Sequence, residues 1–346
     1  MDEGRLRELY EMMVLIRVFE EETERQYKKA RIGGYCHLAS GQEAATVGVL
    51  EPLSDDDVLF TSYRDHGFAL ARGVSPEAVM AELFGRCDGC ARGRGGSMHL
   101  ADPDRNYLGG WGIVGGQLPL ATGAAFALAH RDEPHAVLVE LGEGAVNMGA
   151  WHESLNLAGI WELPIVYLVM NNVYGMGTSV DKASAEPEVF RRAAAYRMRG
   201  ERVDGQDLEG IVGAADELLH EARDERRPSV LELMTYRFRG HSVADAGKAY
   251  RSEDEIAGWK ERDPIPTLAA RLGLSDDEVA EVERQMVERV DEAVRFAEDS
   301  EFPPVDGLAR HVYGDPDSPR QFERMAPGSP FGERELVLEG GGLGHD

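Results

Sequence analysis

Two short polar motifs in the middle of the chain could together bind a cation and a phosphate group. Gly142-Glu143-Gly144 follows an apolar run at 135–141, and Asn171-Asn172 ends a second run at 165–170. Glycines let backbone N–H groups approach a phosphate closely, and carboxylate and amide oxygens are ligands that Mg²⁺ prefers. Two ordinary turns after buried strands are the plainer interpretation, but the pairing of both motifs is uncommon by chance. The pattern therefore favours a magnesium and phosphate site.

The elements around these motifs must bring them to one edge of a sheet. The runs His135–Leu141, Ile165–Met170 and Val230–Met234 are typical of buried strands, and helix-like segments separate them at Trp151–Ile160 and Leu208–Arg223. Strands that alternate with helices in this way predict an α/β fold, with a mostly parallel sheet and helices on both faces. Ligands in such sheets bind outside the carboxyl ends of the strands, so the two motifs should lie side by side.

Further elements are expected toward both ends of the chain. Apolar spacing predicts an amphipathic helix over 2–29, and Ser75-Pro76 begins a short helix that ends near Phe84. A capping box at Ser275–Glu278 begins another helix, which runs to about Ala297. We predict one domain over 1–315 and a Pro/Gly-rich tail over 316–346.

The charge of the chain limits its partners. The 37 basic and 63 acidic residues give a net charge of −26, which disfavours a general role on nucleic acids or anionic membranes. The acidic, helix-like N-terminus does not resemble a signal or transit peptide, and no apolar run is long enough to span a bilayer. Three cysteines cannot form a disulfide framework, so the lone pair Cys87/Cys90 is interpreted as free thiols and a cytoplasmic location is expected.

Six further segments share their order with one known family. They are CHLASGQEA (36–44), SYRDHGF (62–68), GRGGSMH (93–99), GIVGGQ (112–117), YGMGTS (174–179) and RGHS (239–242). With the GEG and NN motifs, the chain resembles the alpha subunit of the decarboxylating component of thiamine-diphosphate-dependent 2-oxo acid dehydrogenases, over roughly 5–315. The YGMGTS segment is more similar to the pyruvate dehydrogenases than to the acetoin or branched-chain enzymes.

The resemblance implies a residue for each part of a thiamine diphosphate site. The implied Mg²⁺ ligands are the side chains of Glu143 and Asn172 and the backbone carbonyl of Tyr174. The implied diphosphate ligands are Tyr63, Arg64, His241 and the backbones of Gly144 and Ala145. The backbones of Gly112 and Val114 would contact the aminopyrimidine, and Met176 would lie beneath the bent cofactor. His37 would face the substrate carboxylate, and His241 would also help to order the site.

Each implied role has a structural alternative. An isolated histidine or methionine is more often part of the packing than of a site, and only the matched motifs reverse this for His37, His241 and Met176. His66 and His99 are expected to satisfy loop backbone and are left out of the site. Ser242 follows His241, but we predict no regulation by phosphorylation there.

Glu143 departs from the family, which has aspartate at this position. One additional methylene moves the carboxylate by about 1.5 Å, and Mg²⁺ tolerates little departure from octahedral geometry. We expect that metal binding is retained because Asn172, Tyr174, Tyr63 and Arg64 all persist. A non-catalytic paralogue that binds metal weakly is the alternative.

The implied activity is thiamine-diphosphate-dependent oxidative decarboxylation of a 2-oxo acid, most similar to that of pyruvate dehydrogenase, with acyl transfer to a lipoyl domain of the acyltransferase component. The family's pyrimidine-protonating glutamate belongs to a separate beta subunit, so an α2β2 heterotetramer is expected. Acetoin or branched-chain 2-oxo acid dehydrogenase and an unrelated phosphate-binding α/β protein remain as alternatives.

The arginines suggest a basic pocket within an acidic exterior. Arg86, Arg92 and Arg94 cluster in the glycine-rich stretch 85–123, while Arg64 and Arg239 lie in the matched motifs. We expect these side chains to surround the bound dianionic cofactor.

Overall fold

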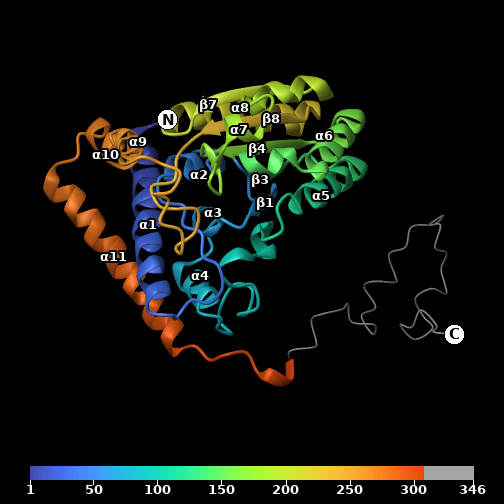
Figure 1. Cartoon of the computed structure of the whole chain (residues 1–346). Helices are drawn as coiled ribbons and strands as arrows, with labels where there is room; N and C mark the ends of the chain where they lie inside the picture. The colour runs from blue at the N-terminus through green and yellow to red at the C-terminus, as the bar shows by residue number, and fades with distance from the viewer. Residues whose placement is uncertain (308–346) are drawn as a thin grey trace. The chain divides into compact units, whose positions relative to one another are not determined.

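The computed structural model describes residues 1–307, in which the strands form a six-stranded sheet with helices on both faces (Figure 1). Met1–Phe302 form one compact unit. Of the second unit, Pro303–Asp346, the described residues contain one 3₁₀ turn at Val305–Gly307. The predicted domain boundary at 315/316 and the predicted tail lie outside the described residues.

Every neighbouring pair of strands in the sheet is parallel, which confirms the predicted α/β class. In spatial order the strands are β2 (Tyr107–Trp111), β1 (Val58–Ser62), β3 (Val137–Gly142), β4 (Ile165–Asn171), β8 (Ser229–Met234) and β7 (Arg199–Asp204). A small antiparallel ribbon, β5 (Tyr174–Gly175) with β6 (Thr178–Ser179), follows the end of β4. The three predicted strands correspond to β3, β4 and β8.

Alternating side chains of the central strands form two cores. In β3, Leu138 packs into the core shared with α1 (Glu3–Lys28), α2 (Glu43–Leu50) and α8 (Leu208–Glu225), whereas Val137 and Val139 pack against the other core. That second core lies under α5 (Gln117–Arg131) and α6 (Gly149–Trp161), on the opposite side of the sheet from α1 in Figure 1. Burial on both faces explains why these strands are continuous apolar runs in the sequence.

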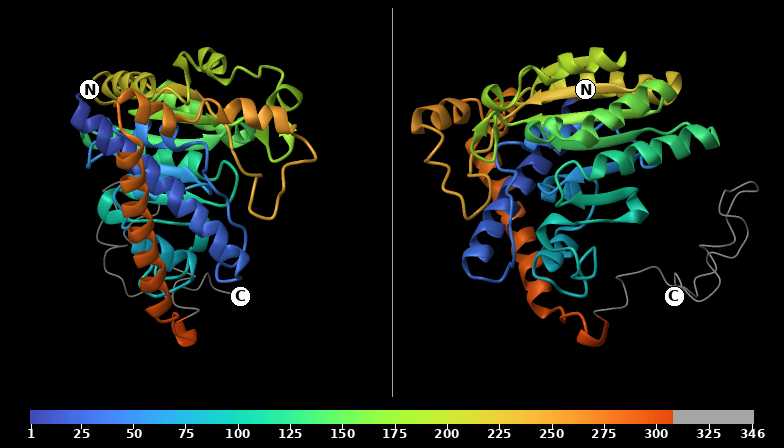
Figure 2. Two further views of the ribbon diagram at one scale, coloured as in Figure 1. Left: turned by 90° about the vertical axis from the view of Figure 1, so that its left-hand side faces the viewer. Right: turned by 45° about the vertical axis from the view of Figure 1, so that its right-hand side comes forward.

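The predicted terminal helices are present and pack on one another. Helix α11 (Asp276–Asp299) begins with the expected capping box, because Ser275 and Glu278 each accept a hydrogen bond from the other's backbone N–H. It runs beside α1 (Figure 2) and contacts α4 (Pro76–Leu83). The remaining helices are α3 (His66–Ala71), α7 (Val180–Ala183), α9 (Glu253–Lys260), α10 (Pro264–Arg271) and the 3₁₀ segments η1 (Gly96–Met98), η2 (Pro103–Arg105), η3 (Glu143–Asn147) and η4 (Val189–Tyr196). No helix among the described residues is long and apolar enough to cross a membrane.

Candidate active site

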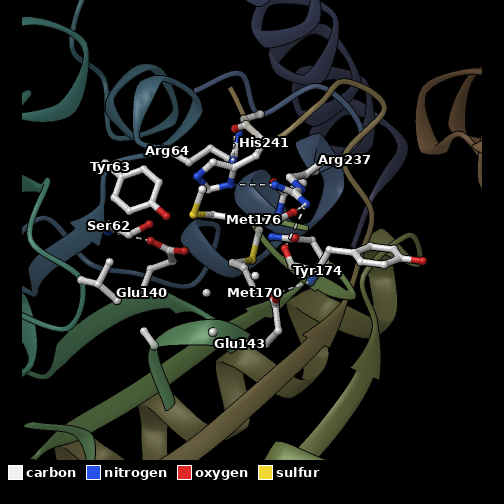
Figure 3. Close-up of a pocket in the computed structure, with 18 of the residues that line it drawn as sticks. Ser62, Tyr63, Arg64, Glu140, Glu143, Met170, Tyr174, Met176, Arg237 and His241 are labelled. Carbon is white, nitrogen blue, oxygen red and sulfur yellow. Dashed lines mark hydrogen bonds between the residues drawn. The ribbon is translucent and has the colours of Figure 1, made fainter. Parts of the chain in front are cut away.

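A cavity of about 520 Å³ lies at the carboxyl ends of β1, β3 and β4 (Figure 3). The residues expected from the sequence that line it are Tyr63, Arg64, Val114, Glu143, Gly144, Ala145, Asn172, Tyr174, Met176 and His241. The cavity is also lined by residues that the sequence did not single out, including Glu140, Gln117 and Arg237. His37 and Gly112 are not part of the lining: His37 packs against Tyr63 with a tilted ring and against His241 edge to face, and Gly112 lies beside His99.

Four residues that line the cavity have a buried side-chain oxygen without a hydrogen-bond partner within the described residues: Gln42, Gln117, Glu143 and Asn172. Of these, Glu143 and Asn172 adjoin, because Asn172 N–H donates to Glu143 Oε2 at 3.1 Å and leaves Glu143 Oε1 and Asn172 Oδ1 unsatisfied. Burial raises the pKa of Glu143, since its charge has been moved out of water. Unsatisfied carboxylate and amide oxygens are a donor set that suits a hard divalent cation.

The polypeptide after β4 is held in an unusual conformation that brings this pair together. Asn171 holds this turn in place, because its amide nitrogen donates to Glu232 at 2.6 Å and its amide oxygen accepts from Val173 N–H at 3.1 Å. Val173 and Met176 have φ angles of 75° and 52°, in the left-handed region that side chains disfavour. Within residues 1–307 no three His, Cys, Asp or Glu side chains gather into a metal site, so a cation here depends on amide and backbone oxygens.

Two buried guanidinium groups face the same cavity. Arg64 is 8% exposed and donates to the carbonyls of Leu38 and His241, at 2.6 and 2.9 Å. Arg237 is 1% exposed and donates to the carbonyls of Tyr174 and Met176, at 2.9 and 3.1 Å. Neither forms a salt bridge within residues 1–307, and burial lowers the pKa of both, that of Arg237 to about 10. Two unpaired buried cations side by side favour a bound dianion.

Arg237 also changes the expected role of Tyr174. The carbonyl that the resemblance implies as a metal ligand accepts the Arg237 hydrogen bond in this structure. A carbonyl oxygen has two lone pairs, so it retains one for a further partner. Metal binding by Tyr174 therefore stays a prediction.

His241 is a neutral hydrogen-bond donor in this arrangement. Its Nδ1 pairs with Nη1 of Arg237 at 2.9 Å; because a guanidinium can only donate, Nδ1 accepts and the imidazole proton lies on Nε2. Burial, then Arg64 and Arg237, lower the pKa of His241 to about 4. Burial and Arg64 likewise lower the pKa of His37 to about 2, and its Nδ1 has no partner among the described residues. Both rings are uncharged at neutral pH.

The prediction that five arginines surround the bound cofactor is wrong for most of them. Of the five arginines only Arg64 lines the cavity. Arg86 stacks on Phe302 with its guanidinium carbon 3.7 Å from the ring centroid, and Arg239 pairs with Glu24 at 3.2 Å. Arg92 and Arg94 are exposed on the glycine-rich loop. The second cavity cation is instead Arg237, the first of two arginines in the TYRFRGHS segment that follows β8.

Glu140 is the second acidic residue of the cavity. It lies in β3, is 3% exposed, and accepts a hydrogen bond from Ser62 N–H at 2.7 Å. Burial raises its pKa to about 7. The signal in the sequence was an acidic residue inside the apolar run HAVLVEL, where buried strands rarely contain one.

The two histidines left out of the site have structural roles. His66 is fully buried and pairs with Glu20 and Ser97, at 2.8 and 2.9 Å. His99 pairs with the Gly110 carbonyl at 3.0 Å. The prediction that both satisfy loop backbone is wrong for His66, whose partners are side chains, whereas His99 does pair with backbone, that of strand β2.

The parallel sheet, with an oxygen pair at its carboxyl edge and two buried arginines facing the same cavity, defines the chain as an α/β protein. The chain belongs to the dehydrogenase E1 component family, whose model matches residues 10–306, and this places it among the oxidoreductases. It is 43% identical over 304 residues to the pyruvate dehydrogenase E1 component subunit alpha of Rhizobium meliloti (strain 1021), which covers 86% of this chain and 87% of that protein.

Other relatives have the same description. The pyruvate dehydrogenase E1 component subunit alpha of Rickettsia felis is 40% identical over 305 residues, 87% of this chain and 93% of that protein. The chloroplastic subunit alpha-3 of Oryza sativa subsp. japonica is 40% identical over 322 residues, 89% of this chain and 76% of that protein.

Proposed function

We propose that this chain is the alpha subunit of a pyruvate dehydrogenase that uses thiamine diphosphate and Mg²⁺, and that passes the acyl group to a lipoyl domain. The family and the names of the relatives support a 2-oxo acid dehydrogenase alpha subunit. The observation that carries the cofactor assignment is a single cavity lined by the adjoining Glu143 and Asn172, each with an unsatisfied buried oxygen, and by the unpaired buried guanidiniums of Arg64 and Arg237.

The residues present fit both parts of this ligand. Glu143 and Asn172 would hold Mg²⁺ through the oxygens that have no other partner. Arg64, Arg237 and the Nε2–H of His241 would hold the diphosphate, because each donates hydrogen bonds and the two guanidiniums supply the opposite charge. The bound cofactor supplies an electron sink for decarboxylation of the 2-oxo acid.

The chain's own residues then orient and shield that chemistry. Arg237 fixes the backbone of Tyr174 and Met176, which keeps Met176 against the cavity in its left-handed conformation. His37, neutral and packed against Tyr63 and His241, is not in the lining, so contact with a substrate carboxylate would require Tyr63 or His241 to move. This role of His37 remains a prediction from the sequence.

An apolar surface beside the cavity supports a partner subunit. Helix α5 has no charged side chain between residues 117 and 129, although its outer face exposes Leu120, Gly123 and Phe126. Phe126 packs against Trp161 of α6 with tilted rings, whose centroids are 5.2 Å apart. In a chain with a net charge of −26, such a face is typical of a protein interface. Its continuity with the cavity at Val114 favours a beta subunit that completes the site, in an α2β2 assembly.

We also propose a cytoplasmic location. All three cysteines are free, and Cys36 is buried, as expected for a protein of a reducing compartment.

The test is reconstitution with a beta subunit of a pyruvate dehydrogenase E1 component from the same organism. Calorimetric titration of thiamine diphosphate with and without Mg²⁺ should give metal-dependent binding, and the complex should reduce an artificial electron acceptor with pyruvate faster than with branched-chain 2-oxo acids or acetoin. Addition of a lipoyl domain should allow acyl transfer. Binding that needs no Mg²⁺, with no turnover of any substrate, would favour the non-catalytic paralogue, and preference for another substrate would reassign the enzyme within the family.

A further inference from the structure

Glu140 is a buried carboxylate that the cation and diphosphate sites do not use. It is 3% exposed and lines the cavity, and within residues 1–307 it forms no salt bridge. It accepts a hydrogen bond from Ser62 N–H at 2.7 Å, and hydrogen bonding by the Ser62 side chain also lowers its pKa, so one neutral residue supplies its donors. Buried carboxylates are normally paired with a cation or held by several donors, because the loss of water is costly. A carboxylate left in this state at a cavity wall points to a positively charged part of the ligand.

Its position separates Glu140 from the metal ligands. The Glu143 and Asn172 oxygens lie at the ends of β3 and β4, whereas the Glu140 carboxylate turns toward Ser62 at the end of β1 (Figure 3). The neighbour of β1 on its other side is β2, whose end leads to Val114 on the cavity wall. Glu140 therefore lies between the cation and phosphate end of the cavity and the Val114 end.

Thiamine diphosphate has the matching distribution of charge. Its thiazolium ring bears one positive charge and joins the diphosphate arm to the aminopyrimidine. If the diphosphate is held near Glu143 and Arg237 and the aminopyrimidine near Val114, the thiazolium ring must lie between them, on the side where Glu140 lines the cavity. We propose that Glu140 recognises the positive charge of the thiazolium ring, so that the cavity selects the cationic cofactor over neutral rings of the same shape. This inference rests on the proposed function.

The groups around Glu140 leave its charge available. Tyr63 and Arg64 follow Ser62, Glu143 faces it from η3, and Gln117 of α5 donates to the Glu140 backbone carbonyl at 2.8 Å. The hydrogen bonds of Arg64 go to the Leu38 and His241 carbonyls. Burial, with Glu143 as a like charge nearby, accounts for a Glu140 pKa of about 7. A cation bound beside the carboxylate would favour its ionised form.

The experiment compares two ligands of one shape and different charge. Thiamine diphosphate and 3-deazathiamine diphosphate, whose ring is a neutral thiophene, are titrated at pH 8 with fixed Mg²⁺ into the alpha–beta complex. The variant is Glu140→Gln, which keeps the shape of the side chain and removes its charge. Glu133→Gln, at a carboxylate of which 40% of the side chain is exposed, is the matched control. Thermal unfolding verifies that each complex is folded.

We expect Glu140→Gln to weaken thiamine diphosphate binding by on the order of tenfold and to leave the neutral analogue unchanged or tighter. Glu133→Gln should change neither affinity. Equal weakening of both ligands, or no weakening of either, would overturn the assignment of Glu140. Failure of both diphosphates to bind the wild-type complex would instead overturn the proposed function.

A measurement on the wild type keeps the inference testable if the variant does not fold. The ratio of the two affinities is measured between pH 6 and pH 8. Because the carboxyl ionises across this range, preference for the charged ring should rise by several-fold with pH. A ratio that stays constant or falls with pH contradicts a charge-selective role for Glu140.

Discussion

Replacement of Glu143 by glutamine should change stability in opposite directions in the free and the ligand-bound protein. The amide keeps an oxygen that can accept the Asn172 N–H bond, and it nearly preserves the size of the side chain. It removes a carboxylate that is 2% exposed, has no salt bridge within residues 1–307 and has a pKa raised by burial. The substitution therefore separates two contributions to the free energy of unfolding: the destabilisation by the buried charge, and the stabilisation by the metal that this charge would bind.

The two effects have comparable size. Removal of one uncompensated buried charge should raise the free energy of unfolding of the ligand-free protein by about 1 kcal/mol. At a ligand concentration of 100 Kd, binding stabilises the wild type by about 2.7 kcal/mol, and a hundredfold loss of affinity reduces this gain to about 0.4 kcal/mol. The variant should thus be more stable without ligand and less stable with it, by about 1 kcal/mol in each case.

Thermal unfolding is the assay, with and without Mg²⁺ and thiamine diphosphate at fixed concentrations. The Tm of Glu143→Gln should lie about 2 °C above that of the wild type without ligands and about 2 °C below it with them. Asn171→Asp is not a suitable control because Asn171 pairs with Glu232, whereas Glu133→Gln alters a partly exposed carboxylate and should leave both values unchanged. A variant that is stabilised by Mg²⁺ and cofactor as strongly as the wild type would refute the assignment of Glu143 as a metal ligand.

Three further perturbations test the fold and its partner surface. Between pH 5 and pH 8, urea unfolding should show the ligand-free wild type losing about 2.5 kcal/mol relative to Glu140→Gln. The folded pKa of about 7 lies above the ordinary 4.5, so the cost of the buried charge accumulates as the pH rises from 4.5 to 7 and is complete above 7; parallel profiles would contradict this. Glu82→Ala should lower the free energy of unfolding in urea by about 3 kcal/mol or more, because the carboxylate accepts four backbone N–H bonds from residues 91–96. A decrease below about 1 kcal/mol would show that water replaces the carboxylate. Phe126→Asp should abolish the alpha–beta complex in size-exclusion chromatography. It should change the free energy of unfolding of the free chain by less than about 0.5 kcal/mol, because Phe126 is exposed there. An intact complex would exclude α5 from the interface.

The sequence was sufficient to predict those elements that pack on both sides. β3, β4 and β8 are buried along almost their whole length, so their apolar runs are unambiguous. β7 was not predicted because it is a partly exposed edge strand with the polar sequence RGERVD, and β2 was not predicted because its YLGGW lies in a glycine-rich stretch. Their places are fixed by hydrogen bonds to neighbouring strands, which is tertiary information that local periodicity does not contain.

Site residues that lie in a recognisable sequence motif could be predicted. Residues that reach the site from distant segments of the chain were harder to predict. Glu143 and Asn172 could be paired because parallel strands bring their carboxyl ends together, and the N–H bond between them has that geometry. Arg237 was missed because its function depends on carbonyls more than 60 positions earlier, on the turn after β4. The arginines of the glycine-rich stretch were included because they are close in sequence, yet the fold directs Arg86 to Phe302 rather than to the cavity.

Net charge identifies excluded partners, but the pairing of charges identifies the site. On the surface, arginine and glutamate side chains compensate one another, as Arg199 does with Glu201, Glu217 and Glu221. In the cavity, Arg64, Arg237 and Glu140 remain apart and unpaired within residues 1–307, although all are buried. Salt bridges among these three side chains would reduce the free-energy cost of burying their charges. They would also leave no free charges of either sign to bind a ligand that carries both. The free protein therefore keeps a destabilising separation of charge that a ligand of complementary charge would relieve, so ligand binding should raise the free energy of unfolding.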